Sequence, residues 1–92
     1  MSRPPNIIFI GKKPIMTYVN ATLTLLSNEP VVTIKARGKS ITTAVDVSQM
    51  IVKRLNAVGY KVSGVRIFSE RLTSQDGKER NVSIIEVDVS RP

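Results

Sequence analysis

The stretch VVTIKARGKSITTAVDVSQMIVKRLNAVG, residues 31–59, contains the two periodicities that decide the fold. In residues 31–37, apolar side chains alternate with polar ones, as in a strand with one buried face. After Gly38, apolar side chains recur at helical spacing as far as Gly59, a natural helix C-cap. This helical stripe consists of Ile41, Ala44, Val45, Ile51, Val52, Leu55 and Val58. The stretch therefore predicts a strand over residues 31–37 and a helix over residues 40–58.

The residues upstream repeat the order of strand and helix. Residues 6–10 are a mainly apolar run that ends at Gly11, which predicts a short strand buried on both faces. Pro14 fixes φ at a first helical position, and apolar residues then recur every three or four positions. These are Ile15, Val19, Leu23 and Leu26. A helix over residues 14–27 is expected.

Two further strands are expected at the end of the chain, joined by a polar turn. Residues 60–72 are rich in β-forming side chains, and their alternation changes phase at Ser63 and Gly64, which predicts a bulge. The dipeptide Asp76-Gly77 is typical of hairpin turns, and residues 81–89 then resume the alternation. A long hairpin is expected, with a tip that projects beyond the two helices.

These elements predict an α/β fold of the α+β two-layer sandwich type. The order is β-α-β-α-β-β, with a mixed four-stranded sheet, two helices and a long projecting C-terminal hairpin. Because each helix returns the chain across the sheet, the first three strands should be parallel and the fourth antiparallel to the third. Folding at this length buries only about 60–65% of the chain's surface, which allows one core. We expect a single domain over residues 1–92, with residues 1–5 disordered.

The composition points away from most enzymes and toward an acidic polymer. The chain has 14 Lys and Arg against 7 Asp and Glu, and it lacks His, Cys and Trp. It therefore lacks the usual zinc ligands, disulfides and thiol nucleophiles, and its carboxylates are scattered. Gly38-Lys39-Ser40 matches the end of a phosphate-binding P-loop, but the glycine that this loop requires at position 33 is Thr. We expect no enzymatic activity, cofactor, metal or small-molecule substrate.

Hydropathy gives an expectation for the location of the protein. The longest uninterrupted apolar stretch, Ile7–Ile10, is far shorter than the roughly 20 residues that span a bilayer. Met1–Pro5 is not followed by an apolar segment long enough for a secretory signal. Neither helix is a strongly basic amphipathic helix of the kind that binds membrane surfaces. We expect a cytoplasmic protein with no membrane partner.

Two groups of cations precede the two predicted helices. Lys12 and Lys13 stand at a helix N-terminus, where the helix dipole opposes them unless an anion binds between them. The alternative is a pair of solvated loop lysines. Lys35, Arg37 and Lys39 lead into the second helix, also beyond the carboxyl end of a strand, where ligands of α/β sheets commonly bind. The prediction is a rim of five cations, among which no carboxylate is interleaved except Glu29 at the opposite end of its strand, and such a rim suits phosphate groups. The alternative is a face that serves only solubility.

Two other features leave alternatives open. The hairpin carries Arg71, Lys78 and Arg80, and a two-stranded ribbon of this kind fits a DNA groove. The nearby carboxylates reduce its charge, so the alternative is a hairpin that does not bind nucleic acid. The first helix has an uncharged outer face that consists of Thr17, Asn20, Thr24 and Ser27. Either this face is simply solvated, or it packs against a partner subunit or a phosphate backbone.

Several motifs occur together in the predicted order. They are Asn6–Ile10 with Gly11-Lys12-Lys13-Pro14, Lys35-Ala36-Arg37-Gly38, the set Ile41, Ala44, Val45 and Asp46, and Thr73-Ser74-Gln75-Asp76-Gly77. In this combination the chain resembles the Alba family of archaeal chromatin proteins from Asn6 to Val89. The resemblance implies a homodimer that binds double-stranded DNA and RNA without strong sequence preference and organises or compacts the archaeal nucleoid. Pairing with a paralogue is a further possibility.

The resemblance also assigns roles to residues. Lys12 and Lys13 would contact phosphates on the dimer body with Arg37 nearby, and the hairpin arms, residues 71–80, would follow the minor groove. Lysine acetylation would map to Lys12, and dimer–dimer contact to Leu55, where related chains often have an aromatic residue. The expected nucleic-acid-binding residues are Lys12, Lys13, Lys35, Arg37, Lys39, Arg71, Lys78 and Arg80. The alternative function is an RNA-dedicated binding protein or ribonucleoprotein subunit.

Overall fold

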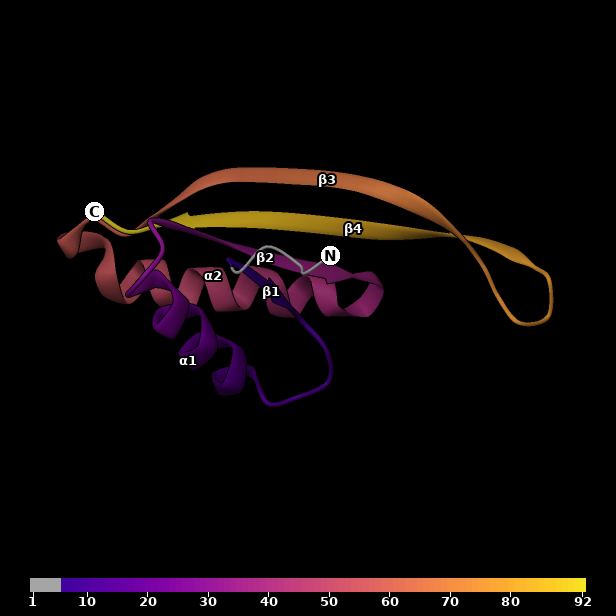
Figure 1. Ribbon diagram of the computed structural model, residues 1–92, viewed down its shortest axis with the longest axis horizontal. Coiled ribbons are helices and arrows are strands. Elements are labelled where there is room, and N and C mark those ends of the chain that lie inside the picture. Colours follow the sequence, from indigo (N-terminus) through magenta and orange to yellow (C-terminus); the bar gives the residue numbers. More distant parts are fainter. Residues whose placement is uncertain (1–5) are drawn as a thin grey trace.

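Two helices cover one face of a four-stranded sheet in the computed structural model, which describes residues 6–92 (Figure 1). The elements are β1 (Ile7–Phe9), α1 (Ile15–Leu26), β2 (Val31–Arg37), α2 (Ile41–Leu55), β3 (Lys61–Thr73) and β4 (Glu79–Ser90). Two 3₁₀ turns, η1 (Gly38–Ser40) and η2 (Asn56–Val58), flank α2. The predicted element order and α+β fold are confirmed, whereas the expectation for residues 1–5 lies outside the described residues.

The strand order in the sheet is β1-β2-β4-β3. β1 pairs parallel with β2, while β4 pairs antiparallel with both β2 and β3. The first three strands therefore run in one direction, as predicted. The sequence did not reveal that β4 lies between β2 and β3. The predicted bulge is confirmed by a register shift between Val62 and Gly64.

The core lies between the helices and the middle of the sheet. The alternating residues of β2 and β4 that face the helices are buried: Val32, Ile34, Ala36, Ile85, Val87 and Val89. In α2 the buried stripe is Ala44, Val47, Ser48 and Ile51. Two members of the predicted stripe, Val45 and Val58, are instead exposed. Val47 and Ser48 take their place, because residues at i, i+3, i+4 and i+7 share one helix face.

The predictions for the first strand and for Pro14 need correction, whereas the prediction for Gly59 is confirmed. β1 is only three residues long, and Phe9 is 45% exposed, so this strand is not buried on both faces. The reason is that no described helix covers the second face of the sheet (Figure 1). Pro14 immediately precedes α1 with ψ of 145°, rather than occupying its first turn. Gly59 ends η2 with φ of 114°, which confirms its capping role.

Leu26 gives a direct test of this packing, because it is fully buried at the end of α1. Leu26→Ala should lower the free energy of unfolding by about 2–5 kcal/mol, since it leaves a cavity between the layers. Val58→Ala, at a position that is 60% exposed, is the control and should cost less than about 0.5 kcal/mol. Urea unfolding at fixed protein concentration measures both, and equal losses would contradict the described core.

Candidate nucleic-acid interface

The loop between β1 and α1 is held in place by a buried tyrosine. The hydroxyl oxygen of Tyr18 accepts hydrogen bonds from the backbone N–H groups of Gly11 and Lys13, each at 2.9 Å. Tyr18 is itself only 6% exposed. Lys12 and Lys13 are exposed, and the first turn of α1 contains no acidic residue. The loop thus presents two ammonium groups beside a helix N-terminus that has no carboxylate to balance them.

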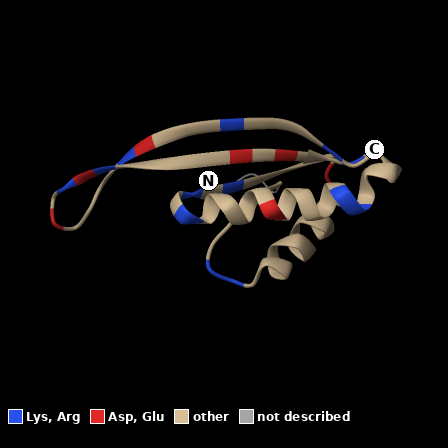
Figure 2. Ribbon diagram, turned by 180° about the vertical axis from the view of Figure 1, so that it is seen from behind, with Lys and Arg blue, Asp and Glu red and all other residues tan. Residues whose placement is uncertain are grey.

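The junction between β2 and α2 lies at the same edge of the sheet. β1 and β2 are parallel, with Phe9 opposite Lys35, so the residues after both strands emerge together. Arg37 and Lys39 are exposed, and Gly38 turns the chain with φ of 58°. Figure 2 shows basic residues in the loop before α1 and at the beginning of α2. We call Lys12, Lys13, Arg37 and Lys39 the rim; no ion pair within residues 6–92 involves any of them.

Lys35 differs from the other predicted cations. Its Nζ lies 3.3 Å from Oε2 of Glu86 and 5.8 Å from the centre of the Phe68 ring. The prediction of a rim without carboxylates is therefore wrong at this position. The prediction fails here because the strand order places Glu86 of β4 directly opposite Lys35 of β2. Much of the charge of Lys35 is already balanced within the protein.

An ion cluster that the sequence did not reveal extends from this pair across the sheet. The guanidinium of Arg66 on β3 donates to Glu86 at 2.8 Å and to both carboxylate oxygens of Asp88, also at 2.8 Å. The hydroxyl of Thr33 donates to Asp88 at 2.7 Å. These hydrogen bonds, with that of Arg66 the largest cause, lower the pKa of both carboxyl groups. The spacing of Glu86 and Asp88 was visible in the sequence, but their partners depend on the strand register.

The hairpin formed by β3 and β4 extends past the helices (Figure 1). At its tip the carboxylate of Asp76 accepts hydrogen bonds from the Ser74 hydroxyl and from the Lys78 backbone N–H, which lower its pKa. Nη1 of Arg71 lies 3.3 Å from Oε2 of Glu79, so these two side chains form an ion pair. Lys78 and Arg80 are exposed without such a partner in the described chain. Of the three predicted hairpin cations, Lys78 and Arg80 are thus free of ion pairs within residues 6–92 and can contact an external anion.

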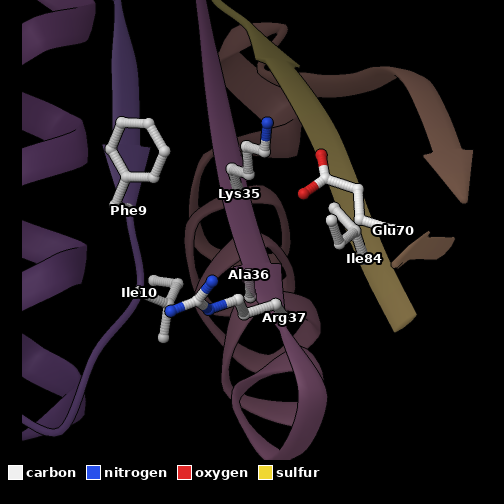
Figure 3. A pocket seen from close by; sticks show the side chains of 7 residues that line it. All are labelled: Phe9, Ile10, Lys35, Ala36, Arg37, Glu70 and Ile84. Carbon is white, nitrogen blue, oxygen red and sulfur yellow. The ribbon is translucent and has the colours of Figure 1, made fainter. Parts of the chain in front are cut away.

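The uncovered face of the sheet contains a pocket of about 380 Å³. The residues that line it are Phe9 on β1, Ile10 directly after β1, Lys35, Ala36 and Arg37 on β2, Glu70 on β3 and Ile84 on β4 (Figure 3). Phe68 is 41% exposed on the same face. The two phenylalanines are thus outside the core of the chain. The face combines apolar groups with charges of both signs.

Leu55 lies on the helical side of the protein, in a groove between the two helices. The groove measures about 220 Å³ and is lined by Val19, Leu23, Met50, Ile51, Arg54 and Leu55. Leu55 is half-buried there, so only part of its side chain is presented outward.

Neither a metal centre nor a membrane span is found in the described residues. Residues 6–92 contain no group of three or more His, Cys, Asp or Glu side chains placed to hold a metal. No helix in this part of the chain has the length and hydropathy needed to cross a bilayer.

The fold and the rim define a small basic α+β protein in which four exposed cations without an ion pair in residues 6–92 gather at one edge of the sheet. The family model that matches residues 6–69 is Alba. A protein of Nitrosopumilus maritimus named DNA/RNA-binding protein Alba is 56% identical over 84 residues, or 91% of this chain and 88% of that protein. A protein of the same name from Methanocella arvoryzae is 40% identical over 88 residues, or 95% of this chain and 91% of that protein.

The structural comparison agrees. Alba from Thermoplasma volcanium superimposes with a TM-score of 0.83 and 42% sequence identity, covering 94% of this chain and all of that chain. The chain belongs to the Alba family. The relatives are named for nucleic-acid binding and not for an enzymatic activity.

The ion cluster predicts how stability depends on pH. Glu86 and Asp88 have ordinary pKa values of 4.5 and 3.8, and the folded protein lowers both. The unfolded chain therefore binds protons first as the pH falls, so the stabilisation is complete at neutral pH and is lost below the ordinary values. The variant with Glu86→Gln and Asp88→Asn should lose less thermal stability than the wild type between pH 6 and pH 3.

Thermal unfolding at several pH values makes this comparison. Asp46→Asn removes a carboxylate outside the cluster and is the control that should keep the steep wild-type profile. Parallel profiles for the double variant and the wild type would show that Arg66 does not favour the charged carboxylates in the folded protein.

Proposed function

We propose that the protein is a non-enzymatic homodimer that binds double-stranded DNA and RNA through phosphate contacts with little sequence preference. The observation that carries the proposal is the rim, in which four exposed cations share one edge of the sheet and form no ion pair within residues 6–92. The names of the relatives support nucleic acid as the polyanion. The cellular role would be organisation or compaction of a chromosome in the cytoplasm.

The mechanism follows from how the rim is held. Tyr18 fixes the loop that carries Lys12 and Lys13, so less conformational freedom is lost when a phosphate binds. The adjacent start of α1 adds backbone N–H groups and the positive end of the helix dipole. Each phosphate that is neutralised releases counterions from the nucleic acid, which drives binding. Phosphate contacts contain no direct information about bases, so this binding tolerates any sequence.

The hairpin supplies the second part of the proposed contact. Lys78 and Arg80 lie near the tip, and a two-stranded ribbon fits into a duplex groove. Arginine is favoured in a narrow minor groove because the negative potential is enhanced there. Arg71 would contribute less, because Glu79 already balances its charge.

The uncovered face of the sheet is the surface we assign to the second copy. Phe9 and Phe68 are exposed on it, beside the mixed-charge pocket. A two-fold axis brings the same patch of both subunits together, so an apolar patch with both signs of charge can complement itself. Burial of large aromatic side chains would supply the main driving force. A paralogue with a similar face could replace one subunit.

Two further properties are proposed for single residues. Acetylation of Lys12 would remove one of the rim cations and weaken phosphate binding. Leu55 would take part in dimer–dimer contact, although part of its side chain packs in the groove between α1 and α2. The area it offers is smaller than that of an aromatic residue, so this association should be weak.

An RNA-dedicated role, as a binding protein or a ribonucleoprotein subunit, is the second candidate. The relatives are named for both nucleic acids, and phosphate contacts serve either duplex. Competition between a DNA duplex and an RNA duplex of the same sequence separates the two roles.

The rim is tested by the double variant Lys12→Ala with Lys13→Ala. It should weaken binding to every duplex sequence by roughly ten- to a hundred-fold near 0.1 M salt and reduce the salt dependence, because a dimer loses four cations. Lys35→Ala is the matched comparison and should weaken binding less than about threefold, since Glu86 pairs with this lysine. Fluorescence anisotropy on several duplexes measures these effects, and unchanged binding by the double variant would refute the site.

The dimer surface is tested by Phe68→Glu and Phe9→Glu. Each variant should sediment as one chain of 10.1 kDa, whereas the wild type should sediment as a particle of twice that mass, since a buried unpaired charge opposes association. Val58→Glu, another exposed apolar residue outside this face, is the control and should leave the dimer intact. A dimer that persists in both phenylalanine variants would place the second copy elsewhere.

A further inference from the structure

The tip of the β3–β4 hairpin contains the dipeptide Asp76-Gly77, to which the proposed contact with nucleic acid assigns no role. Both residues are exposed, and Gly77 adopts φ of 82°. A Cβ added at Gly77 would meet no atom within 4 Å, so the space beside this backbone is open. Aspartate before glycine is especially prone to rearrange into isoaspartate, because glycine has no side chain to hinder attack by its own backbone nitrogen. The tip therefore contains a candidate site of spontaneous covalent modification.

Isoaspartate forms in two steps, of which the first releases one water molecule and the second consumes one. The backbone nitrogen of Gly77 attacks Cγ of Asp76, a nitrogen–carbon bond forms, and the hydroxyl of the carboxylic acid leaves as water with the proton of the amide. Water then adds to the backbone carbonyl carbon of Asp76 in the resulting succinimide, and the bond from this carbon to the Gly77 nitrogen breaks. The chain now continues through Cγ, and the former backbone carbonyl has become a free carboxylate.

The structure opposes the first step at the carboxyl group of Asp76. This group must be protonated before its oxygen can leave as water. The Ser74 hydroxyl and the Lys78 backbone N–H both donate to Oδ1 of Asp76, the latter at 3.1 Å. These hydrogen bonds favour the charged form and lower the pKa of Asp76, with the bond from Ser74 the largest cause. The reactive acid form is therefore rarer at the tip than in an unfolded chain.

The structure also opposes the first step at the attacking nitrogen. The backbone N–H of Gly77 donates to the carbonyl oxygen of Ser74 at 3.0 Å, so the proton that must leave is held in a hydrogen bond. The backbone N–H of Ser74 donates to the carbonyl oxygen of Lys78 at 2.8 Å, which closes the turn. The Ser74 hydroxyl lies 3.0 Å from the same carbonyl oxygen. Ser74 thus contacts the carboxylate, the attacking amide and the far side of the turn.

Formation of the turn does not by itself require a hydroxyl at position 74. The two backbone hydrogen bonds of Ser74 with Gly77 and Lys78 can be made by any residue other than proline, and Gly77 supplies the positive φ. The hydroxyl adds the bond to the Asp76 carboxylate, which no backbone group of residue 74 makes in the structure. The specific contribution of the Ser74 side chain is therefore control of the carboxylate.

We propose that Asp76-Gly77 is a site of isoaspartate formation and that the Ser74 hydroxyl protects it in the folded protein. Rearrangement would lengthen the main chain between Ser74 and Lys78 and so disrupt the hydrogen bonds that close the turn. Lys78, an exposed cation of the hairpin, would then lose its fixed position. The inference does not rest on the proposed function, because the rearrangement takes place in the protein without nucleic acid.

The experiment follows isoaspartate at position 76 while the full-length protein is incubated at mildly acidic pH. Digestion after lysine releases residues 62–78, and electron-transfer fragmentation of this peptide distinguishes isoaspartate from aspartate. Ser74→Ala should form isoaspartate at least about threefold faster than the wild type, as expected for the loss of about one hydrogen bond. Ser74→Thr keeps the hydroxyl and should stay within about twofold of the wild-type rate. Ser69→Ala removes a hydroxyl of β3 outside the turn and is the control that should keep the wild-type rate.

Four results would overturn the proposal. Absence of isoaspartate in Ser74→Ala would show that the dipeptide is not a site of this modification, and a rate equal to that of the wild type would show that the hydroxyl does not protect it. Equal acceleration in Ser74→Thr or Ser69→Ala would assign the effect to loosening of the hairpin rather than to the hydroxyl. The isolated peptide of residues 62–78 lacks β4 and is the unprotected reference. A wild-type rate as fast as that of this peptide would show that the folded tip gives no protection.

Discussion

The packing of both helices on one face of the β2–β4 pair determines where the functional side chains lie. Because each helix follows a strand of the same direction and returns across the same face, both helices begin at one edge of the sheet. The cations before each helix therefore meet in the rim. The same packing leaves the second face uncovered, with its aromatic side chains exposed, and lets the hairpin extend past the helices (Figure 1).

The strand register determines which of the many cations form ion pairs within the protein and which do not. On the uncovered face of the sheet, Lys35 and Arg66 are balanced by Glu86 and Asp88, which are brought opposite them by the position of β4. These contacts stabilise strand pairing while leaving little charge for an external partner. Within residues 6–92, the unpaired cations lie before the two helices, around the C-terminal end of α2 and near the hairpin tip. Composition alone indicates a polyanionic partner, and the register indicates which side chains can reach it.

Local patterns in the sequence were sufficient for the elements and for most of the rim. The alternation in residues 31–37 predicted β2 at its observed bounds, and Lys12, Lys13, Arg37 and Lys39 could be placed because they follow strand ends. The position of β4 beside β2 could not be predicted, because that pairing joins residues far apart in the sequence. For the same reason, the ion pair between Lys35 and Glu86 could not be predicted. The exposure of Phe9 was missed for a related reason, since an apolar run does not reveal that helices cover only one face.

The central claim is that phosphate neutralisation by the basic residues drives binding, and its most direct test is the salt dependence of affinity. One random duplex, prepared as DNA and as the matching RNA, is titrated with the wild-type protein at three salt concentrations by fluorescence anisotropy. If a dimer neutralises about six phosphates, the logarithm of the binding constant should fall against the logarithm of salt concentration with a slope near −5 on DNA. A slope near zero on both duplexes would contradict the account.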